Sequence, residues 1–213
     1  TKPAASGSVE PAMATVDFYY GLGSRYSYLA ASRIAGISTR TGATFRWRPL
    51  FSGEMMRRLG RSPFEGAPIS GQYDWDYRQT DAGRWAAFYG IPFIEPARFA
   101  LAPSRYAIAA EAARHWNRTE AFSLALFEAI FATGTPVGNA EIAAAAAKSG
   151  LDPAAHSART DAPEVAAAVD AAVDEALRAG VFGVPTFVVD GDFYWGNDRL
   201  PILEHRLLQG KQK

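Results

Sequence analysis

The sequence predicts an α/β fold in which an all-helical insertion interrupts a small sheet. Its 213 residues begin with the order strand, helix, strand and end with the order helix, strand, strand, helix. Between these two parts the apolar residues follow a helical spacing. We therefore assign residues 15–50 and 159–213 to one α/β domain and residues 51–158 to a helical insertion domain. Residues 1–14 are small and polar, and we expect a disordered tail there.

The first strand is predicted at residues 15–20, because this stretch is β-branched and aromatic. Ser24 stands where the N-cap of the next helix belongs, and the apolar spacing carries that helix to about Thr41, with Gly42 as its end. Residues 43–48 alternate aromatic and arginine side chains, which indicates a second strand. Strand, helix and strand together form a βαβ unit.

The insertion is predicted to consist of short helices joined by loops. These helices are expected at residues 54–59, 74–89, 104–116, 119–131, 139–148 and 152–157. Ser104 and Thr119 are the expected N-caps of two of them. An aromatic cluster on the second helix is expected to lie mostly in the core, although one of its rings could wall a ligand pocket. Its members are Trp75, Tyr77, Trp85 and Phe88.

The chain returns to the sheet through a long helix, which is expected to begin at an Asp161 N-cap and to end at Gly180. Its buried stripe consists of Val165, Val169, Val173 and Leu177. Asp190-Gly191 has the composition of a type I′ turn, so residues 186–189 and 193–195 are expected to pair as a hairpin.

The Val184-Pro185 bond precedes this hairpin and is a candidate for the cis form, which costs only about 0.5–1 kcal/mol before proline. A cis bond would leave the backbone N–H and C=O of Val184 free to face a ligand. Asn197 or Asp198 can cap the last helix, near residues 201–208, whose first amides attract anions. A proline-led strand, a hairpin and such a helix start are typical of the C-terminal half of a thioredoxin-type domain. The predicted fold class is therefore a thioredoxin-like domain interrupted by an all-helical insertion.

The composition excludes several kinds of site. The chain has no cysteine, which rules out disulfides, thiolate metal sites, a cysteine nucleophile and a dithiol redox cycle. A formal net charge of zero argues against nucleic acid or an anionic membrane as the main partner. No apolar run approaches the roughly 20 residues of a membrane span, and we expect a cytoplasmic protein. The three histidines are far apart, and each is expected to be an exposed helical residue: His115, His156 and His205.

The chemistry is predicted to lie where the first strand ends and its helix begins, at residues 24–27. Dithiol oxidoreductases place two cysteines here, where the helix N-terminus lowers a thiol pKa. This chain has Ser24 and Ser27 instead, and no histidine is near in sequence to act as a base. Ser24 is better suited to donate a hydrogen bond to the thiolate of another molecule, which points to glutathione. The alternative is that Ser24 is only a helix cap.

At these positions the sequence resembles the 2-hydroxychromene-2-carboxylate isomerase family. That family is close to the kappa-class glutathione transferases, within the DsbA-like branch of thioredoxin folds. The resemblance extends from about residue 15 to 208 and rests on residues 23–29, 84–85, 89–92, 182–186 and 195–200. It implies a glutathione-dependent cis–trans isomerase that acts on a small aromatic keto acid during the degradation of aromatic compounds. Relatives of this kind are often dimers, so the resemblance also implies a homodimer.

The resemblance assigns roles to individual residues. Ser24 matches the serine that faces the glutathione sulfur, and Val184, before Pro185, matches the residue whose backbone pairs with the cysteinyl part. Asn197 and Asp198 match the pair that receives the γ-glutamyl end. The implied mechanism is addition of the thiolate to the conjugated substrate, rotation about the resulting single bond, and elimination of glutathione.

Three residues depart from the family pattern. Arg25 replaces a usual proline, Gly21 replaces an acidic residue, and Arg61 stands where the kappa class has an asparagine near the peptide. Arginine at 25 and 61 would favour an additional carboxylate, from glutathione's glycine or from a substrate. Either arginine could instead be a solvated surface charge.

Two other functions remain open for the same site. One is a glutathione transferase or peroxidase of the kappa kind, with a different acceptor. The other is a cysteine-free thioredoxin-like protein that binds peptides or thiol compounds without turnover.

Overall fold

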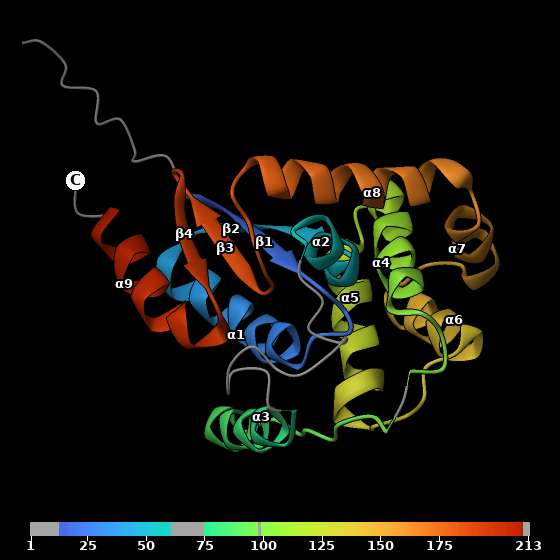
Figure 1. Cartoon of the computed structure of the whole chain (residues 1–213), viewed down its shortest axis with the longest axis horizontal. Coiled ribbons are helices and arrows are strands. Elements are labelled where there is room, and N and C mark those ends of the chain that lie inside the picture. Colours follow the sequence, from blue (N-terminus) through green and yellow to red (C-terminus); the bar gives the residue numbers. More distant parts are fainter. Residues whose placement is uncertain (1–12, 61–74, 98, 211–213) are drawn as a thin grey trace, which may run out of the picture.

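The sheet has four strands and is built from the two ends of the chain (Figure 1). The computed structural model describes residues 13–60, 75–97 and 99–210. The strands are β1 (Thr15–Tyr20), β2 (Thr44–Pro49), β3 (Thr186–Val189) and β4 (Asp192–Trp195), in the spatial order β2-β1-β3-β4. β1 is parallel to β2 and antiparallel to β3, and β3 and β4 form the hairpin. The predicted sequence of helices and strands at both ends of the chain is therefore confirmed.

Helices cover both faces of this sheet. α1 (Arg25–Thr41) and α9 (Leu200–Gly210) lie on one face, and α8 (Pro163–Arg178) lies across the other (Figure 1). β1 alternates accordingly: Phe18 and Tyr20 point into the larger core, while Tyr19 packs on the smaller core beneath α8. α8 buries Val173 in that smaller core.

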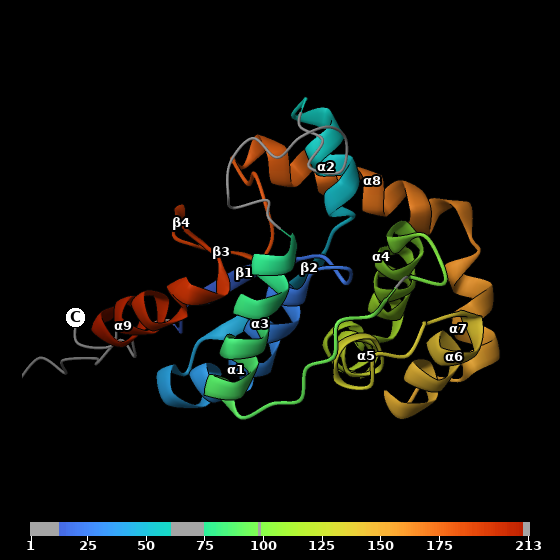
Figure 2. The same cartoon turned by 60° about the horizontal axis from the view of Figure 1, so that its bottom comes forward.

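The insertion consists of short helices between β2 and α8. They are α2 (Ser52–Arg58), α3 (Trp75–Tyr89), α4 (Pro103–Ala112), α5 (Thr119–Phe127), α6 (Asn139–Lys148) and α7 (Pro153–Thr160). Figure 2 shows α4 to α7 as a bundle beside the sheet, whereas α3 stands apart from that bundle and lies along α1. Within the part of the chain that the structure describes, none of the helices combines the length and the apolar character that crossing a membrane requires.

One continuous core joins the sheet to the insertion. Phe18 and Tyr20 from β1 share it with Phe127 from α5, and the rings of Tyr20 and Phe127 are 5.8 Å apart. The Tyr20 hydroxyl is 2.6 Å from Ser123 Oγ, deep in the same core. Burial raises the pKa of Tyr20, so its hydroxyl stays protonated and pairs with Ser123.

The turn and cap predictions near the sheet are confirmed. Ser24 is the N-cap of α1, and Gly42 ends that helix in the left-handed conformation. The Val184-Pro185 bond is cis. Asp190 and Gly191 both have positive φ, 51° and 84°, as a type I′ turn requires.

Three predicted helix caps are wrong. α4 begins one residue before Ser104, because Pro103 occupies the first helical position, where its missing N–H costs nothing. Thr119 is likewise inside α5 rather than at its cap. Asp161 ends α7 instead of capping α8, and its carboxylate accepts a 2.7 Å hydrogen bond from Arg105.

Two predictions about burial are also wrong. The aromatic cluster of α3 is not mostly core: Trp75, Tyr77 and Phe88 are exposed, and only Trp85 packs half-buried against the core. The fully buried residues of α3 are Ala82 and Ala86. His156 is buried rather than exposed, because its ring packs against the ring of Phe122, with 4.6 Å between the two ring centroids.

Candidate functional site

The start of α1 offers one uncommitted hydroxyl. Ser24 Oγ accepts the N–H of Ser27 at 3.2 Å, and the Ser24 N–H donates to the Gly21 carbonyl at 3.0 Å. Ser27 is fully buried, and its Oγ accepts the N–H of Gly21 at 3.3 Å. Ser27 therefore serves the turn. The hydroxyl proton of the half-buried Ser24 has no acceptor among the described residues, so this proton can be donated to an anion.

The cis-proline loop lies beside this turn. A Cβ placed on Gly21 would be 3.4 Å from Val184 Cγ2, so the Val184 side chain lies next to the residue three positions before Ser24. Pro185 is anchored by its carbonyl, which accepts the Gly196 N–H at 2.9 Å. Neither the N–H nor the C=O of Val184 has a hydrogen-bond partner within the described part of the chain. The structure thus brings the Ser24 turn and the Val184 backbone together.

Asn197 and Asp198 follow β4 in a short 3-10 turn, Asn197–Arg199, which precedes α9. Asn197 is only 3% exposed, and its Nδ2 has no partner among the described residues. Asp198 is exposed and pairs with Arg199 at 2.7 Å. Neither side chain caps α9, which corrects the sequence-based expectation, because the 3-10 turn separates them from that helix.

Gly196 shapes this turn. Its φ of 108° belongs to a region that favours glycine, and a Cβ there would collide with Asp198 Oδ1. The Asp198 carboxylate consequently lies directly over the backbone that follows β4.

Of the two arginines that differ from the family pattern, the structure describes only Arg25. Arg61 lies outside the described residues. Arg25 is not a solvated surface charge: its side chain is 12% exposed and pairs with Glu95 at 3.0 Å. Burial raises the pKa of Glu95 and lowers the pKa of Arg25. The opposite charge of the partner acts against both shifts and partly reduces them.

Several residues that border Ser24 were missed by sequence reasoning. A Cβ placed on Gly23 would be 3.4 Å from Pro103 and 3.7 Å from Phe99, and one on Gly21 would be 3.2 Å from Ser52 Oγ. These neighbours come from the insertion, and no local pattern connects them to residues 21–24. Their positions follow from tertiary packing alone.

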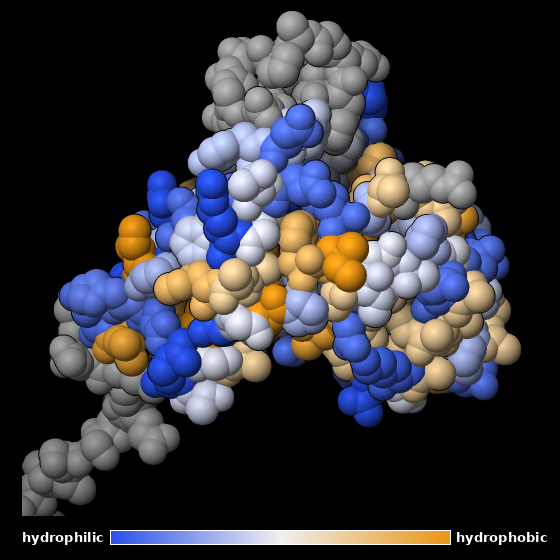
Figure 3. All heavy atoms as spheres, turned by 90° about the horizontal axis from the view of Figure 1, so that it is seen from below, coloured by the Kyte–Doolittle hydropathy of each residue, from blue (hydrophilic) through white to orange (hydrophobic). Residues whose placement is uncertain are grey.

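A cluster of polar and aromatic side chains lies where α1 and α3 meet. The Tyr26 hydroxyl donates to Asp81 Oδ2 at 2.8 Å, and burial together with this carboxylate raises the pKa of Tyr26 to about 12. The guanidinium of Arg78 lies over the rings of Tyr26 and Trp75, at 5.3 and 5.0 Å from their centroids. Figure 3 shows a group of apolar residues near the middle of the face that is seen from below. On α3, Phe88 is 79% exposed.

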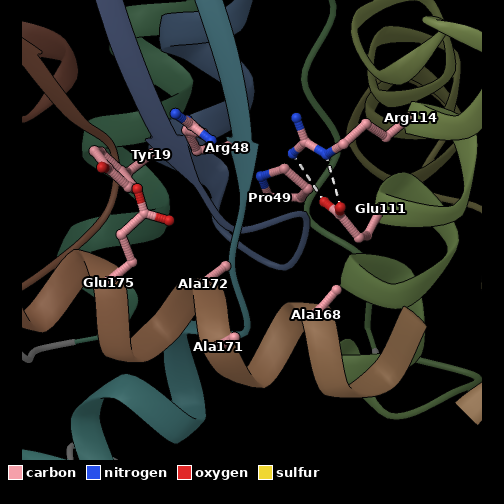
Figure 4. A pocket seen from close by; sticks show the side chains of 9 residues that line it. All are labelled: Tyr19, Arg48, Pro49, Glu111, Arg114, Ala168, Ala171, Ala172 and Glu175. Carbon is pink, nitrogen blue, oxygen red and sulfur yellow. Dashed lines mark hydrogen bonds and ion pairs between the residues drawn. The ribbon is translucent and has the colours of Figure 1, made fainter. Parts of the chain in front are cut away.

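A separate cavity of about 260 Å³ lies behind the sheet, between α8, the end of β2 and α4 (Figure 4). Its lining consists of Tyr19, Arg48, Pro49, Glu111, Arg114, Ala168, Ala171, Ala172 and Glu175. Both arginines in it are already paired, Arg48 with Asp17 and Arg114 with Glu111. None of the predicted site residues lines this cavity, so it is distinct from the Ser24 region.

Comparison with known proteins identifies the family to which this fold belongs. The chain matches the family model of the DSBA-like thioredoxin domain over residues 15–208. A protein of Sphingobium xenophagum, named 2-hydroxychromene-2-carboxylate isomerase, is 33% identical over 195 residues, which are 91% of this chain and 98% of that protein. The solved structure of a 2-hydroxychromene-2-carboxylate isomerase has a TM-score of 0.79 at 27% identity, covering 92% of this chain and 95% of the other.

The similarity to a transferase is shorter. A glutathione S-transferase kappa 1 of Caenorhabditis elegans is 32% identical over 90 residues, or 42% of this chain and 38% of that protein.

Proposed function

Since the chain belongs to the 2-hydroxychromene-2-carboxylate isomerase family, within the DSBA-like thioredoxin domains, we propose that it catalyses the cis–trans isomerisation of such an aromatic keto acid with glutathione as cofactor. The observation that carries this proposal is the 33% identity to a named isomerase over nearly the whole of both chains. The absence of cysteine agrees with it, because the reactive thiol must then come from a cofactor.

The residues present fit glutathione. The free N–H and C=O of Val184 would pair with the cysteinyl backbone, in the way that one strand pairs with another. The exposed carboxylate of Asp198 suits the γ-glutamyl ammonium, and the turn that contains the buried Asn197 would hold that end of the peptide. Glutathione would supply the thiolate that attacks the conjugated double bond.

The chain's own residues would activate and orient that thiol. Ser24 would donate its uncommitted proton to the sulfur, and a hydrogen bond to a charged group contributes roughly 1.5–3 kcal/mol. The amides at the start of α1 would add the favourable field of a helix N-terminus. Arg61 remains a candidate for a glutathione or substrate carboxylate.

The test is the absorbance change of a 2-hydroxychromene-2-carboxylate in the presence of the protein, with and without substoichiometric glutathione. We expect conversion that requires glutathione and does not consume it. Conversion at the same rate without glutathione would remove the cofactor from the proposal.

The competing functions give other results. Conjugation of glutathione to a chlorinated aromatic, without isomerisation, would favour the kappa-type transferase that the partial match suggests. No calorimetric signal with millimolar glutathione would exclude both enzymes and leave a binding protein without turnover.

A cytoplasmic location and a homodimer belong to the same proposal. The cytoplasm holds reduced glutathione, which the reaction would need. Light scattering of the purified chain tests the assembly, and a particle of twice the 23.0 kDa chain mass is expected.

A further inference from the structure

Arg25 joins three segments of the chain at one point. It is the first residue of α1, directly after Ser24. Its Nη2 pairs with Glu95 Oε1 at 3.0 Å, in the segment that follows α3. Its Nη1 donates to the Trp75 carbonyl at 3.5 Å, and its guanidinium lies 5.6 Å from the centre of the Trp75 ring, so it also holds the first residue of α3.

These contacts leave little of Arg25 for a ligand. The side chains of Arg25 and Glu95 are only 12% and 17% exposed, so the pair is largely removed from water. A substrate carboxylate could reach the guanidinium only by displacing Glu95, and this would leave a carboxylate largely buried without its partner. The second oxygen, Glu95 Oε2, already has no hydrogen-bond partner among the described residues, so the pair with Arg25 is important for keeping this group charged.

α3 depends on such polar contacts because it buries little apolar surface. Its fully buried residues are Ala82 and Ala86, and only two of its rings, those of Trp85 and Tyr89, pack half-buried against the main core. It also contacts α1 through the Tyr26–Asp81 hydrogen bond, the Arg78 guanidinium over the Tyr26 ring at 5.3 Å and the Arg33 guanidinium over the Tyr89 ring at 4.9 Å. Figure 2 shows α3 packed along α1 and away from the bundle of α4 to α7.

The segments that Arg25 holds border the candidate reaction centre. Glu95 and Phe99 both belong to the segment that joins α3 to α4, which we call the crossing segment. Phe99 is 3.7 Å from where a Cβ on Gly23 would stand. Trp75 and Arg78 of α3 lie over the first turn of α1. The positions of the crossing segment and of the start of α3 therefore determine the shape of the surface that surrounds the first turn of α1.

We propose that Arg25 is a positioning residue, which fixes α3 and the crossing segment against the start of α1 and thereby shapes the pocket for the aromatic substrate, without itself binding the substrate carboxylate. This inference rests on the proposed isomerase function for its kinetic part. Its structural part does not depend on that function.

The structural test is amide hydrogen exchange of residues 75–89 in Arg25→Ala and in the parent chain. We expect exchange in α3 to become roughly tenfold faster, as a loss of about 1.4 kcal/mol of local stability would produce. The matched control is Arg114→Ala, which removes an arginine that also has one glutamate and one backbone carbonyl as partners, on the opposite side of the sheet. Unchanged exchange in α3 of Arg25→Ala overturns the proposal.

The kinetic test uses Glu95→Gln, which keeps the shape of the side chain and removes its charge. If Arg25 positions this surface, Glu95→Gln and Arg25→Ala both raise the KM for the chromene carboxylate, Arg25→Ala by roughly tenfold, while the glutathione Kd from calorimetry changes less than about twofold. If Arg25 instead binds the substrate, Glu95→Gln frees it and lowers the KM. A lower KM in Glu95→Gln therefore refutes the positioning role.

The two proposals fail separately. A parent chain that binds no glutathione or isomerises no chromene carboxylate contradicts the proposed function, and the exchange experiment still decides the role of Arg25. Normal isomerisation with unchanged exchange in Arg25→Ala contradicts only the role of Arg25.

Discussion

At the scale of single residues, Ser24 combines a structural and a chemical capacity in one hydroxyl. Its oxygen accepts the Ser27 N–H and so caps α1, while its proton remains available beside the Val184 loop. Ser27, at the second position of a dithiol pair, is buried and used by the turn. The two serines are therefore not equivalent, although the sequence presents them symmetrically.

Under the proposed function, Ser24→Ala should lower kcat/KM roughly 10- to 150-fold, because a hydrogen bond from Ser24 to a thiolate would contribute about 1.5–3 kcal/mol. The lost cap should cost only about 1 kcal/mol of stability. Activity assays and thermal unfolding measure the two effects. Ser32→Ala is the control, since Ser32 Oγ donates to a carbonyl on the same helix and lies outside the turn. Equal losses of activity in both variants would contradict the assigned role.

His156 should make the fold sensitive to acid. Burial, with a smaller contribution from Arg105, lowers the pKa of His156 below its usual 6.5, so the folded chain binds this proton less readily than the unfolded chain. Its contribution to stability is complete above about pH 6.5 and is lost as the pH falls from there through the lowered pKa of the folded state.

The measurement is thermal unfolding of the parent and of His156→Gln between about pH 8 and pH 5. The variant keeps a donor for the Ala109 carbonyl, which His156 Nε2 contacts at 2.9 Å, and should show a weaker decline of Tm with falling pH. His115→Gln, which changes an exposed ring, should retain the parent's decline. A decline that is identical in all three proteins would show that another group titrates.

At the scale of helices and strands, α8 and α3 show what a sequence pattern can and cannot predict. The valines of α8 repeat every four residues, and Val165, Val169 and Val173 are buried as expected. α3 has an equally regular aromatic pattern, but its fully buried residues are the alanines Ala82 and Ala86, and its rings are at most half-buried. Periodicity identifies a helix and its faces, whereas the choice of buried face depends on the partner.

The same reasoning applies to the candidate site. Ser24 and Val184-Pro185 could be predicted because an N-cap and an X-Pro bond are local signals. The contact between Arg25 and Glu95 spans 70 positions (95 − 25) and has no local signal, so a solvated arginine was a reasonable expectation that the structure corrects. The sequence predicted that Asn197 and Asp198 lie in the turn before the last helix. It did not predict the 3-10 turn, Asn197–Arg199, which separates these two residues from the start of α9.

α5 offers a test of burial within one helix. Leu126 is fully buried and Leu124 is 37% exposed, so the same substitution can be compared two residues apart. Leu126→Ala should cost about 2–5 kcal/mol through lost burial and the cavity left behind, and Leu124→Ala less than about 1 kcal/mol. Urea unfolding of both variants gives the values. Similar losses would mean that α5 does not pack as described.

At the scale of the whole molecule, the sheet and the insertion share one hydrophobic core. Phe18 and Phe187 from the sheet lie in the same cluster as two residues of the insertion, Phe122 in α5 and Phe131 shortly after it. The inserted helices therefore depend on the sheet for part of their hydrophobic core and are not expected to fold without it.

The chain should therefore unfold in one cooperative step. We expect far-ultraviolet circular dichroism, which reports the helices, and tryptophan fluorescence, which includes Trp47 in β2, to give coincident urea transitions. Residues 51–158 expressed alone should remain unfolded, because they lack the sheet half of the core. Two separated transitions, or a folded fragment, would contradict a shared core.

The hydrogen bond between Tyr20 and Ser123 has an implication for how this enzyme family diversifies. Tyr20 is the last residue of β1, and the next residue along the chain lies next to the Val184 side chain. A substitution in α5 that moves Ser123 should therefore shift the end of β1, which leads into the turn before Ser24. Under the proposed function, replacements in a distant helix can change substrate preference while Ser24 and the Val184-Pro185 loop stay the same.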